Sequence, residues 1–190
     1  MADTFTVIFD ACVLCPFALR DLLVQLATTD LFRGRWTQTI HDEWMRAVLE
    51  QHPEIKRSQL ERTRQLMDLH VLDSVVTGYE PLIDGLHLPD PDDRHVLAAA
   101  VRCGAQVIVT KNLRHFPASV LEPLGIESQH PDDFVGCLLD LNPGIVCGCV
   151  KRCRSILKNP PKSVGEYLEI LARQELNTTV AALGEYAALL

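Results

Sequence analysis

Hydrophobic and polar positions follow two different periods along the first 110 residues, and this predicts strands separated by helices. Residues 5–9 and 106–110 are short runs rich in β-branched residues, which is typical of buried strands. A further apolar run, 71–76, is a candidate strand. Apolar residues at helical spacing predict helices over segments 17–26, 36–49, 53–69 and 94–102. This order of elements implies an α/β fold with a mostly parallel sheet.

Residues at the ends of these segments indicate where the helices start and stop. Thr37 or Thr39 fits the N-cap of the second helix, and Asp92 or Asp93 fits the N-cap of the fourth. Gly104 follows the fourth helix in the position expected of a helix stop. The helix boundaries therefore have local sequence signals as well as an apolar face.

Proline and glycine mark the segments that connect these elements. Pro16 opens the first helix, because proline is tolerated in a first helical turn. Segment 33–35, Arg-Gly-Arg, is expected to be a turn, and segment 88–93, with two prolines, a loop. Residues 103–105 alone separate the fourth helix from the strand that follows, which is a normal length for a connection between a helix and a strand.

The pattern changes after Ile126, where helical signals continue and no strand pattern is evident. Ser163 and Glu166 have the spacing of a capping box. Helices are expected over 131–141, from there to about 157, over 164–173 and over 178–189. The chain is therefore predicted to consist of an α/β domain over residues 1–140 and a helical C-terminal extension over residues 141–190.

The composition predicts a cytoplasmic location. Of the 190 residues, 47% are hydrophobic, which suffices for a core, yet no uninterrupted run is long enough to cross a bilayer. Met1–Thr4 contains no basic residue, so no signal peptide is expected. Seven cysteines, an odd number, suit a reducing compartment better than a disulfide framework.

The net charge of −7 limits the nucleic-acid partners that this chain is expected to bind. A strongly basic domain would indicate broad electrostatic binding to duplexes, and the acidic balance argues against that. It does not exclude a nuclease, because an acidic metal centre itself contributes negative charge.

Acidic and amide side chains lie at the expected ends of strands and helices. Asp10 follows the first strand, Glu43 lies in the second helix, Asp93 starts the fourth helix, and Asn112 comes just after the strand 106–110. Such positions converge at the carboxyl edge of an open parallel sheet. Converging carboxylates repel one another unless a divalent cation binds them, which predicts an Mg²⁺ or Mn²⁺ site and phosphate chemistry.

Four successive motifs resemble those of PIN domains, which are metal-dependent ribonucleases. The motifs are Ile8-Phe9-Asp10-Ala11-Cys12-Val13-Leu14, then Glu43, then the segment from Asp90 to Ala100, then the segment from Val107 to Pro117. The resemblance covers residues 5–117 and continues to about residue 140. It implies a PIN-like three-layer domain, a small parallel sheet flanked by helices. The helical extension is similar to that of one bacterial subgroup, and many bacterial PIN proteins are VapC-like toxins of toxin–antitoxin pairs.

The resemblance assigns roles to individual residues. Asp10, Glu43 and Asp93 match the metal-binding acids, and Asn112 falls where many members have a fourth catalytic aspartate. Asp90 or Asp92 could take the role of Asp93, because the triple acid leaves the register open. His115 stands where an acid is often found. The implied reaction is endonucleolytic cleavage of RNA by metal-activated water.

Residues beside the expected site are candidates for holding RNA. Lys111 and Arg114 could bind a phosphate, and the Thr110 hydroxyl could hold a carboxylate or the substrate. The simpler interpretation of Thr110 is a β-branched strand residue. The resemblance also implies a cognate antitoxin protein and a possible homodimer, and the lack of a long apolar run predicts no association with a membrane.

Simpler interpretations exist for each motif. Asp10 could cap the following turn, Glu43 could complement a helix dipole, and Asn112 could form a turn. Cys12 and Cys15 form a C-x-x-C motif, but buried thiols that pack as small hydrophobes are the default over zinc or redox chemistry.

Two other functions remain open from the sequence. One is a PIN-like module that binds RNA or protein without catalysis, which Asn112 and His115 favour. The other is an Mg²⁺-dependent phosphatase with Asp10 as nucleophile. Such phosphatases of the haloacid-dehalogenase type generally show D-x-D, and position 12 is a cysteine here.

Overall fold

A parallel four-stranded sheet lies at the centre of the protein. The computed structural model describes residues 4–190, so Met1–Asp3, on which the expectation of no signal peptide partly rests, lie outside the described residues. The strand order is β2-β1-β3-β4, and all three pairings are parallel. The strands are β1 (Thr6–Phe9), β2 (Arg33–Arg35), β3 (Val107–Val109) and β4 (Glu127–Gln129). Their carboxyl ends therefore share one edge of the sheet.

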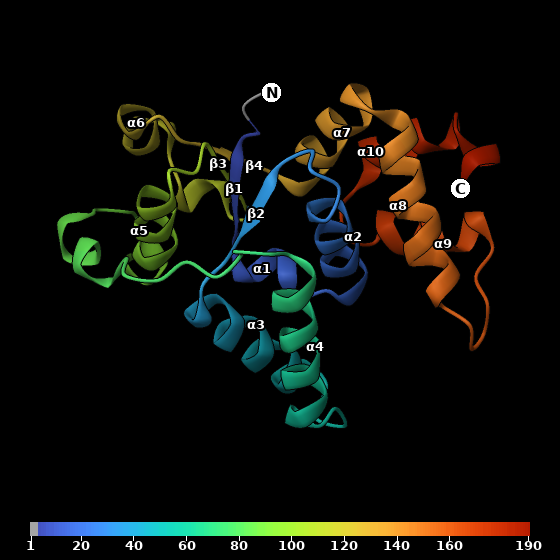
Figure 1. Ribbon diagram of the computed structural model, residues 1–190, viewed down its shortest axis with the longest axis horizontal. Coiled ribbons are helices and arrows are strands. Elements are labelled where there is room, and N and C mark those ends of the chain that lie inside the picture. The colour runs from blue at the N-terminus through green and yellow to red at the C-terminus, as the bar shows by residue number, and fades with distance from the viewer. Residues whose placement is uncertain (1–3) are drawn as a thin grey trace.

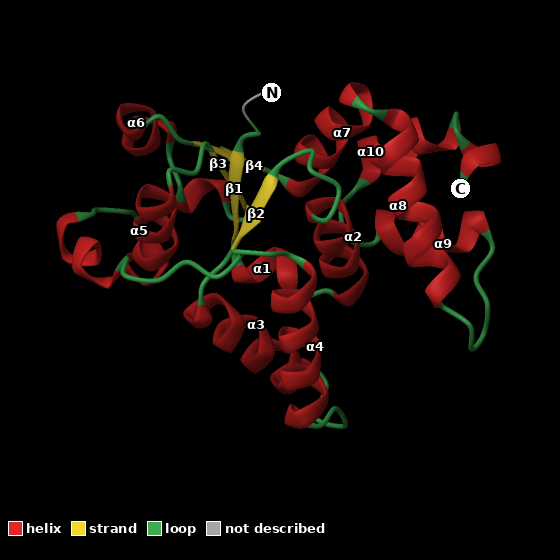
Figure 2. Ribbon diagram, viewed as in Figure 1, coloured by secondary structure: helices red, strands yellow, loops and turns green. Residues whose placement is uncertain are grey.

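Helices flank this sheet and continue into the C-terminal extension. In Figures 1 and 2, α5 and α6 lie to one side of the strands, α2 and α7 to α10 lie to the other, and α1, α3 and α4 lie below them. The helices are α1 (Ala11–Leu14), α2 (Phe17–Ala27), α3 (Gln38–Gln51), α4 (Arg57–His70), α5 (Arg94–Cys103), α6 (Ala118–Leu121), α7 (Pro131–Leu141), α8 (Pro143–Ile156), α9 (Val164–Ala172) and α10 (Asn177–Gly184). Short 3₁₀ segments are η1 (Glu80–Gly85), η2 (Pro91–Asp93), η3 (Leu113–His115), η4 (Glu122–Leu124) and η5 (Ala187–Leu189). The predicted α/β class with a helical extension is confirmed.

The two central strands explain why the sequence showed continuous apolar runs. Every residue of β1 and β3 is buried, because helices cover both faces of the sheet. Phe9 of β1, Phe32 and Phe134 of α7 pack edge to face, with ring centroids 5.1 to 6.2 Å apart. This aromatic cluster fixes α7 against the sheet.

Both edge strands differ from the expectation. Segment 33–35 is strand β2 rather than a turn, because Arg33 and Arg35 pair with β1 through their backbones. Gly34 suits this place because a Cβ there would lie 2.9 Å from Cβ of Ala27. Strand β4 lies in the region that was expected to be wholly helical, and it pairs with β3. Polar edge strands have no apolar periodicity in sequence, so they can be identified only from their backbone pairing in the structure.

Other expected boundaries shift. Segment 71–76 is not a strand in the described structure, and only an isolated bridge joins Val75 to Trp36. The third helix, α4, begins at Arg57 instead of Pro53. The extra helix α1 follows Asp10 directly.

The capping residues are confirmed in part. Oγ1 of Thr37 accepts a hydrogen bond from the Ile40 N–H at 3.1 Å, and Gly104 has φ of 66°. Asp93 stands at the N-cap of α5 but makes no capping bond with its side chain, so neither Asp92 nor Asp93 caps α5 as expected. The carboxylate of Asp90 caps the preceding 3₁₀ segment η2, where it accepts from the Asp92 N–H at 3.0 Å.

The C-terminal extension packs back on α7. The predicted capping box of α9 is present between Ser163 and Glu166. The Asp132 carboxylate in α7 accepts hydrogen bonds from the backbone N–H groups of Thr178 and Thr179, at 2.9 and 2.8 Å. These bonds hold the first turn of α10. None of the described helices combines the length and apolar character that crossing a bilayer requires.

Candidate active site

Asp10 lies at the carboxyl edge of the sheet, directly after β1. Its side chain is buried, and its N–H donates to the Val109 carbonyl at 3.1 Å. Oδ2 accepts hydrogen bonds from the Thr110 hydroxyl at 2.7 Å and from the Cys12 thiol at 3.0 Å. Because both bonds go to Oδ2, the oxygen that Asp10 can offer to a cation is Oδ1.

Thr110 and Cys12 also hold the chain segment that follows β3. The Lys111 N–H donates to Sγ of Cys12 at 3.3 Å, and the Asn112 N–H donates to Oγ1 of Thr110 at 3.0 Å. Burial, followed by the charge of Asp10, raises the pKa of the Cys12 thiol far above its ordinary range. Cys12 therefore remains a protonated hydrogen-bond donor to Asp10.

Asp93 lies in a cluster with Asp90 and His115. Nδ1 of His115 is 2.7 Å from Oδ2 of Asp93 and 3.5 Å from Oδ2 of Asp90. One potential ligand atom from each residue lies within 4.8 Å of the others, a spacing that could hold a metal ion. Asp92 is exposed and lies outside this cluster. The structure thus groups Asp90 with Asp93, where the sequence left the three aspartates open.

The charge of Asp10 affects the pKa of the Asp93 carboxyl. Burial raises the pKa of the Asp93 carboxyl, the charges of Asp10 and Asp90 raise it further, and the hydrogen bond from His115 lowers it in part. The net direction is upward. The charge of Asp10 therefore acts on the Asp93 carboxyl, which places the two side chains at the same end of the sheet.

Glu43 reaches the same end of α5 from α3. Its Oε1 lies 3.0 Å from Nε2 of His95, which is two residues after Asp93. The other ring nitrogen, Nδ1 of His95, is buried and has no hydrogen-bond partner in residues 4–190. No hydrogen bond or ion pair in that range joins Glu43 directly to Asp10 or Asp93. His95 is the link.

The residues that were predicted to contact RNA differ in their surroundings. Nζ of Lys111 lies 3.4 Å from Oε2 of Glu175 in the C-terminal extension. Arg114 is exposed and lines a shallow pocket of about 340 Å³ with Asp90 and His115. The Asn112 side chain makes no hydrogen bond among the described residues, so its backbone alone ties it to the centre.

The residues present fit a divalent cation. Carboxylate oxygens are the ligands that Mg²⁺ and Mn²⁺ prefer. Burial is the largest cause of the raised pKa of Asp93, and the negative charges of Asp10 and Asp90 add electrostatic repulsion. A bound cation would relieve that repulsion.

Sequence reasoning missed three features of this centre. Cys12 was expected to pack as a small hydrophobe, yet it donates to Asp10. His95 had no assigned role, although it holds Glu43. Asp90 was only an alternative to Asp93, and both lie in the cluster. The sequence held one signal for two of these residues. Cys12 lies two positions after Asp10, and His95 lies two positions after Asp93, so each is close to a predicted acid along the chain.

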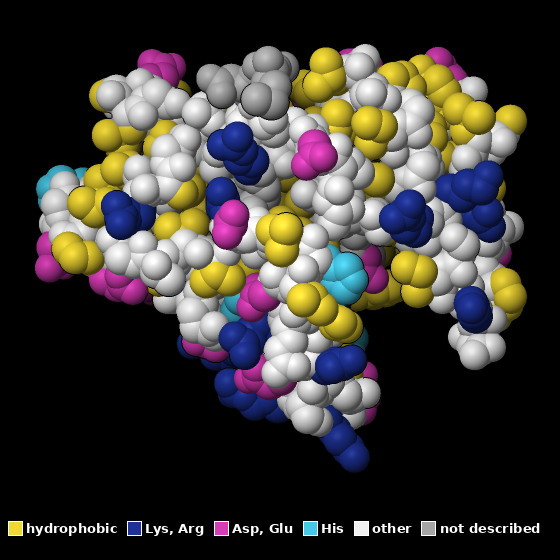
Figure 3. Space-filling view, in the orientation of Figure 1, with side chains coloured by type: hydrophobic (Ala, Val, Ile, Leu, Met, Phe, Trp, Pro, Cys, Tyr) yellow, Lys and Arg dark blue, Asp and Glu magenta, His cyan; other side chains and the backbone are white. Residues whose placement is uncertain are grey.

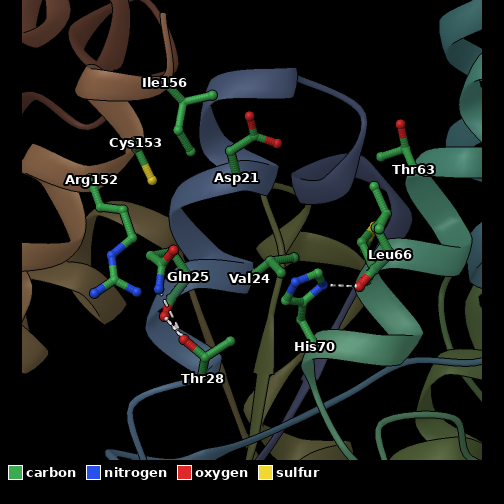
Figure 4. Close-up of a pocket in the computed structure, with 11 residues that line it drawn as sticks. Asp21, Val24, Gln25, Thr28, Thr63, Leu66, His70, Arg152, Cys153 and Ile156 are labelled. Carbon is green, nitrogen blue, oxygen red and sulfur yellow. Dashed lines mark hydrogen bonds between the residues drawn. The ribbon is translucent and has the colours of Figure 1, made fainter.

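A separate pocket of about 660 Å³ lies between α2, α4 and α8, away from the predicted acids. Figure 4 shows Asp21 and Gln25 of α2, His70 of α4 and Arg152 of α8 around it. None of Asp10, Glu43 and Asp93 is among its lining residues. This pocket is therefore not the candidate catalytic centre.

Comparisons with known proteins agree with this arrangement. A family model described as "PIN domain" matches residues 6–114, and one described as "VapC50 C-terminal domain" matches residues 131–185. A curated relative from Mycobacterium tuberculosis (strain ATCC 25618 / H37Rv), "Putative ribonuclease VapC50", is 41% identical over 97 residues, which are 51% of this chain and 57% of that protein. The aligned part thus spans less than two thirds of the relative. No solved structure matches. Because the PIN model covers more than half of the sequence, the chain belongs to the PIN domain family, as a VapC-like member.

Proposed function

We propose that this protein is an Mg²⁺- or Mn²⁺-dependent endoribonuclease. The observation that carries the proposal is the convergence of buried Asp10 with the Asp90, Asp93 and His115 cluster, at the carboxyl edge of the sheet of a PIN domain. A relative described as a putative ribonuclease supports the substrate class.

Asp10, Glu43 and Asp93 would hold the cation. When bound, it would activate a water molecule for attack on the phosphodiester and stabilise the leaving oxygen. Thr110 and Cys12 orient Asp10 by binding Oδ2, and His95 orients Glu43. Such supporting hydrogen bonds fix the geometry of metal ligands.

The surroundings of the acids supply the contacts to RNA. Lys111 and Arg114 would bind phosphates on either side of the cleaved bond, and Asn112 would offer a neutral oxygen. On the face shown in Figure 3, acidic and basic side chains are interspersed, and Lys and Arg gather over the protruding α3–α4 region. This mixed surface suits a short single-stranded segment better than a long duplex.

We also propose that the protein is the toxin of a toxin–antitoxin pair. The match of residues 131–185 to the VapC50 C-terminal domain model, and the 41% identity over 97 residues to a protein described as a putative ribonuclease VapC50, support this. The expected partners are RNA, a cognate antitoxin protein and a second copy of the chain. Expression in a bacterial host should arrest growth, and coexpression of a small protein encoded by the neighbouring gene should restore it.

Cleavage of a short labelled RNA tests the catalytic proposal. Asp10→Asn should abolish Mg²⁺- or Mn²⁺-dependent cleavage while circular dichroism shows an intact fold. Asp133→Asn, which removes an exposed acid from α7, is the matched control and should cleave like the wild type. Equal cleavage by Asp10→Asn and wild type would reject the proposal.

A catalytically silent binding module is the second candidate, because Asn112 and His115 stand where relatives often have acids. Calorimetry with Mn²⁺ separates the two functions. Heat of binding that Asp10→Asn removes supports the nuclease, whereas no binding at millimolar Mn²⁺ supports the silent module. A phosphatase is disfavoured, since Cys12 occupies the second acidic place of D-x-D and donates a hydrogen bond to Asp10.

A further inference from the structure

The turn between α9 and α10 brings a carboxylate from the C-terminal extension to the edge of the sheet. Oε2 of Glu175 lies 3.4 Å from Nζ of Lys111 and 3.5 Å from Nε2 of His130. Glu175 has φ of 69°, a left-handed conformation that non-glycine residues adopt at a cost. The turn therefore has a defined shape that points this carboxylate at two nitrogen donors.

The hydrogen bonds of His130 determine which of its nitrogens carries the proton. Nδ1 of His130 accepts from the Asp132 N–H at 3.2 Å, so the proton of the neutral ring is on Nε2. Nε2 faces Glu175. The Lys111 ammonium and the His130 Nε2–H are thus two donors that converge on one acceptor oxygen.

This pair of donors adjoins the candidate active site. Lys111 and His130 follow β3 and β4, and the Thr110 N–H donates to the Gln129 carbonyl at 3.0 Å. Thr110 also binds Asp10. An anion held by Lys111 and His130 would therefore lie along the same carboxyl edge as Asp10.

We propose that Lys111 and His130 form a binding site for one RNA phosphate, and that Glu175 occupies this site until RNA displaces it. The identity of the anion as an RNA phosphate rests on the proposed function. A carboxylate and a phosphodiester each offer oxygen acceptors with one negative charge, so one can replace the other. The C-terminal extension then acts as a built-in competitor for substrate.

The environment of Glu175 permits this exchange. Its side chain is 61% exposed, so it can leave Lys111 without exposing a buried apolar surface. The charge of Lys111 lowers the pKa of the Glu175 carboxyl, which keeps it ionised and able to compete. Asp132 holds α10 independently through Thr178 and Thr179, so removing the charge of Glu175 leaves the extension docked.

The chain offers a matched pair of variants. Glu175→Gln removes the competing charge. Glu169→Gln removes an exposed glutamate whose one ion pair among residues 4–190 is with Arg173, at 3.9 Å on the surface. Glu175→Asn is a second test variant, because asparagine tolerates the left-handed region better than glutamine.

Titration with inorganic phosphate, followed by NMR of the histidine rings, tests the site without any need for catalysis. Exposed ion pairs contribute little free energy, so Glu175→Gln should bind phosphate about two- to fivefold more tightly than wild type. Glu169→Gln should match wild type. Adding Lys111→Met to Glu175→Gln should remove the gain.

A parallel kinetic experiment extends the result to RNA. In Glu175→Gln, KM for a short RNA should fall by a similar factor while kcat is unchanged. Phosphate affinity that is unchanged or weaker in both Glu175 variants would overturn the competitor role even if the wild type cleaves RNA. A phosphate gain without ribonuclease activity would support the anion site and reject the proposed function instead.

Discussion

The Thr110 hydroxyl donates a hydrogen bond of 2.7 Å to Oδ2 of Asp10, across 100 positions of sequence. The bond joins the ends of the two central strands, which pair in parallel. Thr110 is fully buried, so water does not compete for its hydroxyl. Thr110 therefore determines how the Asp10 carboxylate is presented at the candidate metal site.

Thr110→Val should lower cleavage activity and Mn²⁺ affinity without changing the fold. Valine keeps the shape of threonine but cannot donate to Asp10 or accept from the Asn112 N–H. Loss of a hydrogen bond that supports a metal ligand typically costs roughly 10- to 100-fold in affinity or activity. Calorimetry with Mn²⁺ and a cleavage assay measure both effects.

Thr110→Ser keeps the hydroxyl and is the control for this substitution. It should retain most of the Mn²⁺ affinity. If serine and valine impair binding equally, packing of the threonine methyl group matters and the hydrogen bond to Asp10 does not.

Cys12 should react slowly with iodoacetamide in the folded protein at pH 8. Alkylation needs the thiolate, and burial beside the Asp10 charge raises the pKa of the Cys12 thiol far above that pH. Cys137 is exposed and serves as the internal control that should be labelled first. Peptide mass spectrometry over time gives the order of labelling, and Cys12 labelled as fast as Cys137 would contradict the hydrogen-bonded thiol.

Asp93→Asn should stabilise the metal-free protein while abolishing cleavage. Burial and the charges of Asp10 and Asp90 raise the pKa of Asp93, so the folded state binds a proton more readily than the unfolded state. Stability of the wild type therefore falls as pH rises from about 3.9, the ordinary value for aspartate, through the raised pKa of the folded state. Asparagine does not ionise, so the Asp93→Asn variant does not lose stability over this pH range. Its free energy of unfolding should therefore exceed that of the wild type at pH values above the raised pKa.

Urea unfolding between pH 3.5 and pH 7.5 measures this difference. The advantage of Asp93→Asn should be small at the acidic end and full at neutral pH. Asp92→Asn, which removes the exposed neighbouring acid, is the control. If the free energy of unfolding changed with pH in the same way for wild type and Asp93→Asn, the pKa of Asp93 would not be raised in the folded state.

Burial on both faces made the central strands predictable from sequence, and its absence concealed the edge strands. Strands β1 and β3 contain continuous apolar residues because helices cover both sides. Strand β2 is Arg-Gly-Arg and β4 is Glu-Ser-Gln, and neither has an apolar pattern. Their conformation comes from backbone pairing with a neighbour, which is tertiary information.

The same distinction applies to the candidate site. Asp10 was recognisable because a carboxylate directly after a buried strand lies at the edge where ligands bind. Its partner Thr110, the pair of Glu43 with His95, and the contact of Lys111 with Glu175 join residues distant in sequence. No local pattern encodes these contacts, so the sequence predicted the acids and the structure was needed for the residues that position them.

Asp132→Ala should destabilise the docking of the C-terminal extension. The Asp132 carboxylate accepts from two backbone N–H groups in the first turn of α10, and loss of a helix cap costs about 0.5–2 kcal/mol. Asp133→Ala removes an exposed acid from the same turn of α7, so it matches the loss of charge without the capping bonds. Urea unfolding followed by circular dichroism compares the two variants.

The pH dependence of the Asp132→Ala effect gives a second, independent check. Burial raises the pKa of Asp132, but the hydrogen bonds from Thr179 and Thr178 outweigh it, so the net pKa is lowered. The stabilisation by Asp132 is therefore fully present above about pH 3.9, the ordinary aspartate pKa, and is lost as pH falls through the lower pKa of the folded state. The difference between wild type and Asp132→Ala should shrink in that acidic range. A difference that stays constant to pH 2 would mean that the charged carboxylate does not hold α10.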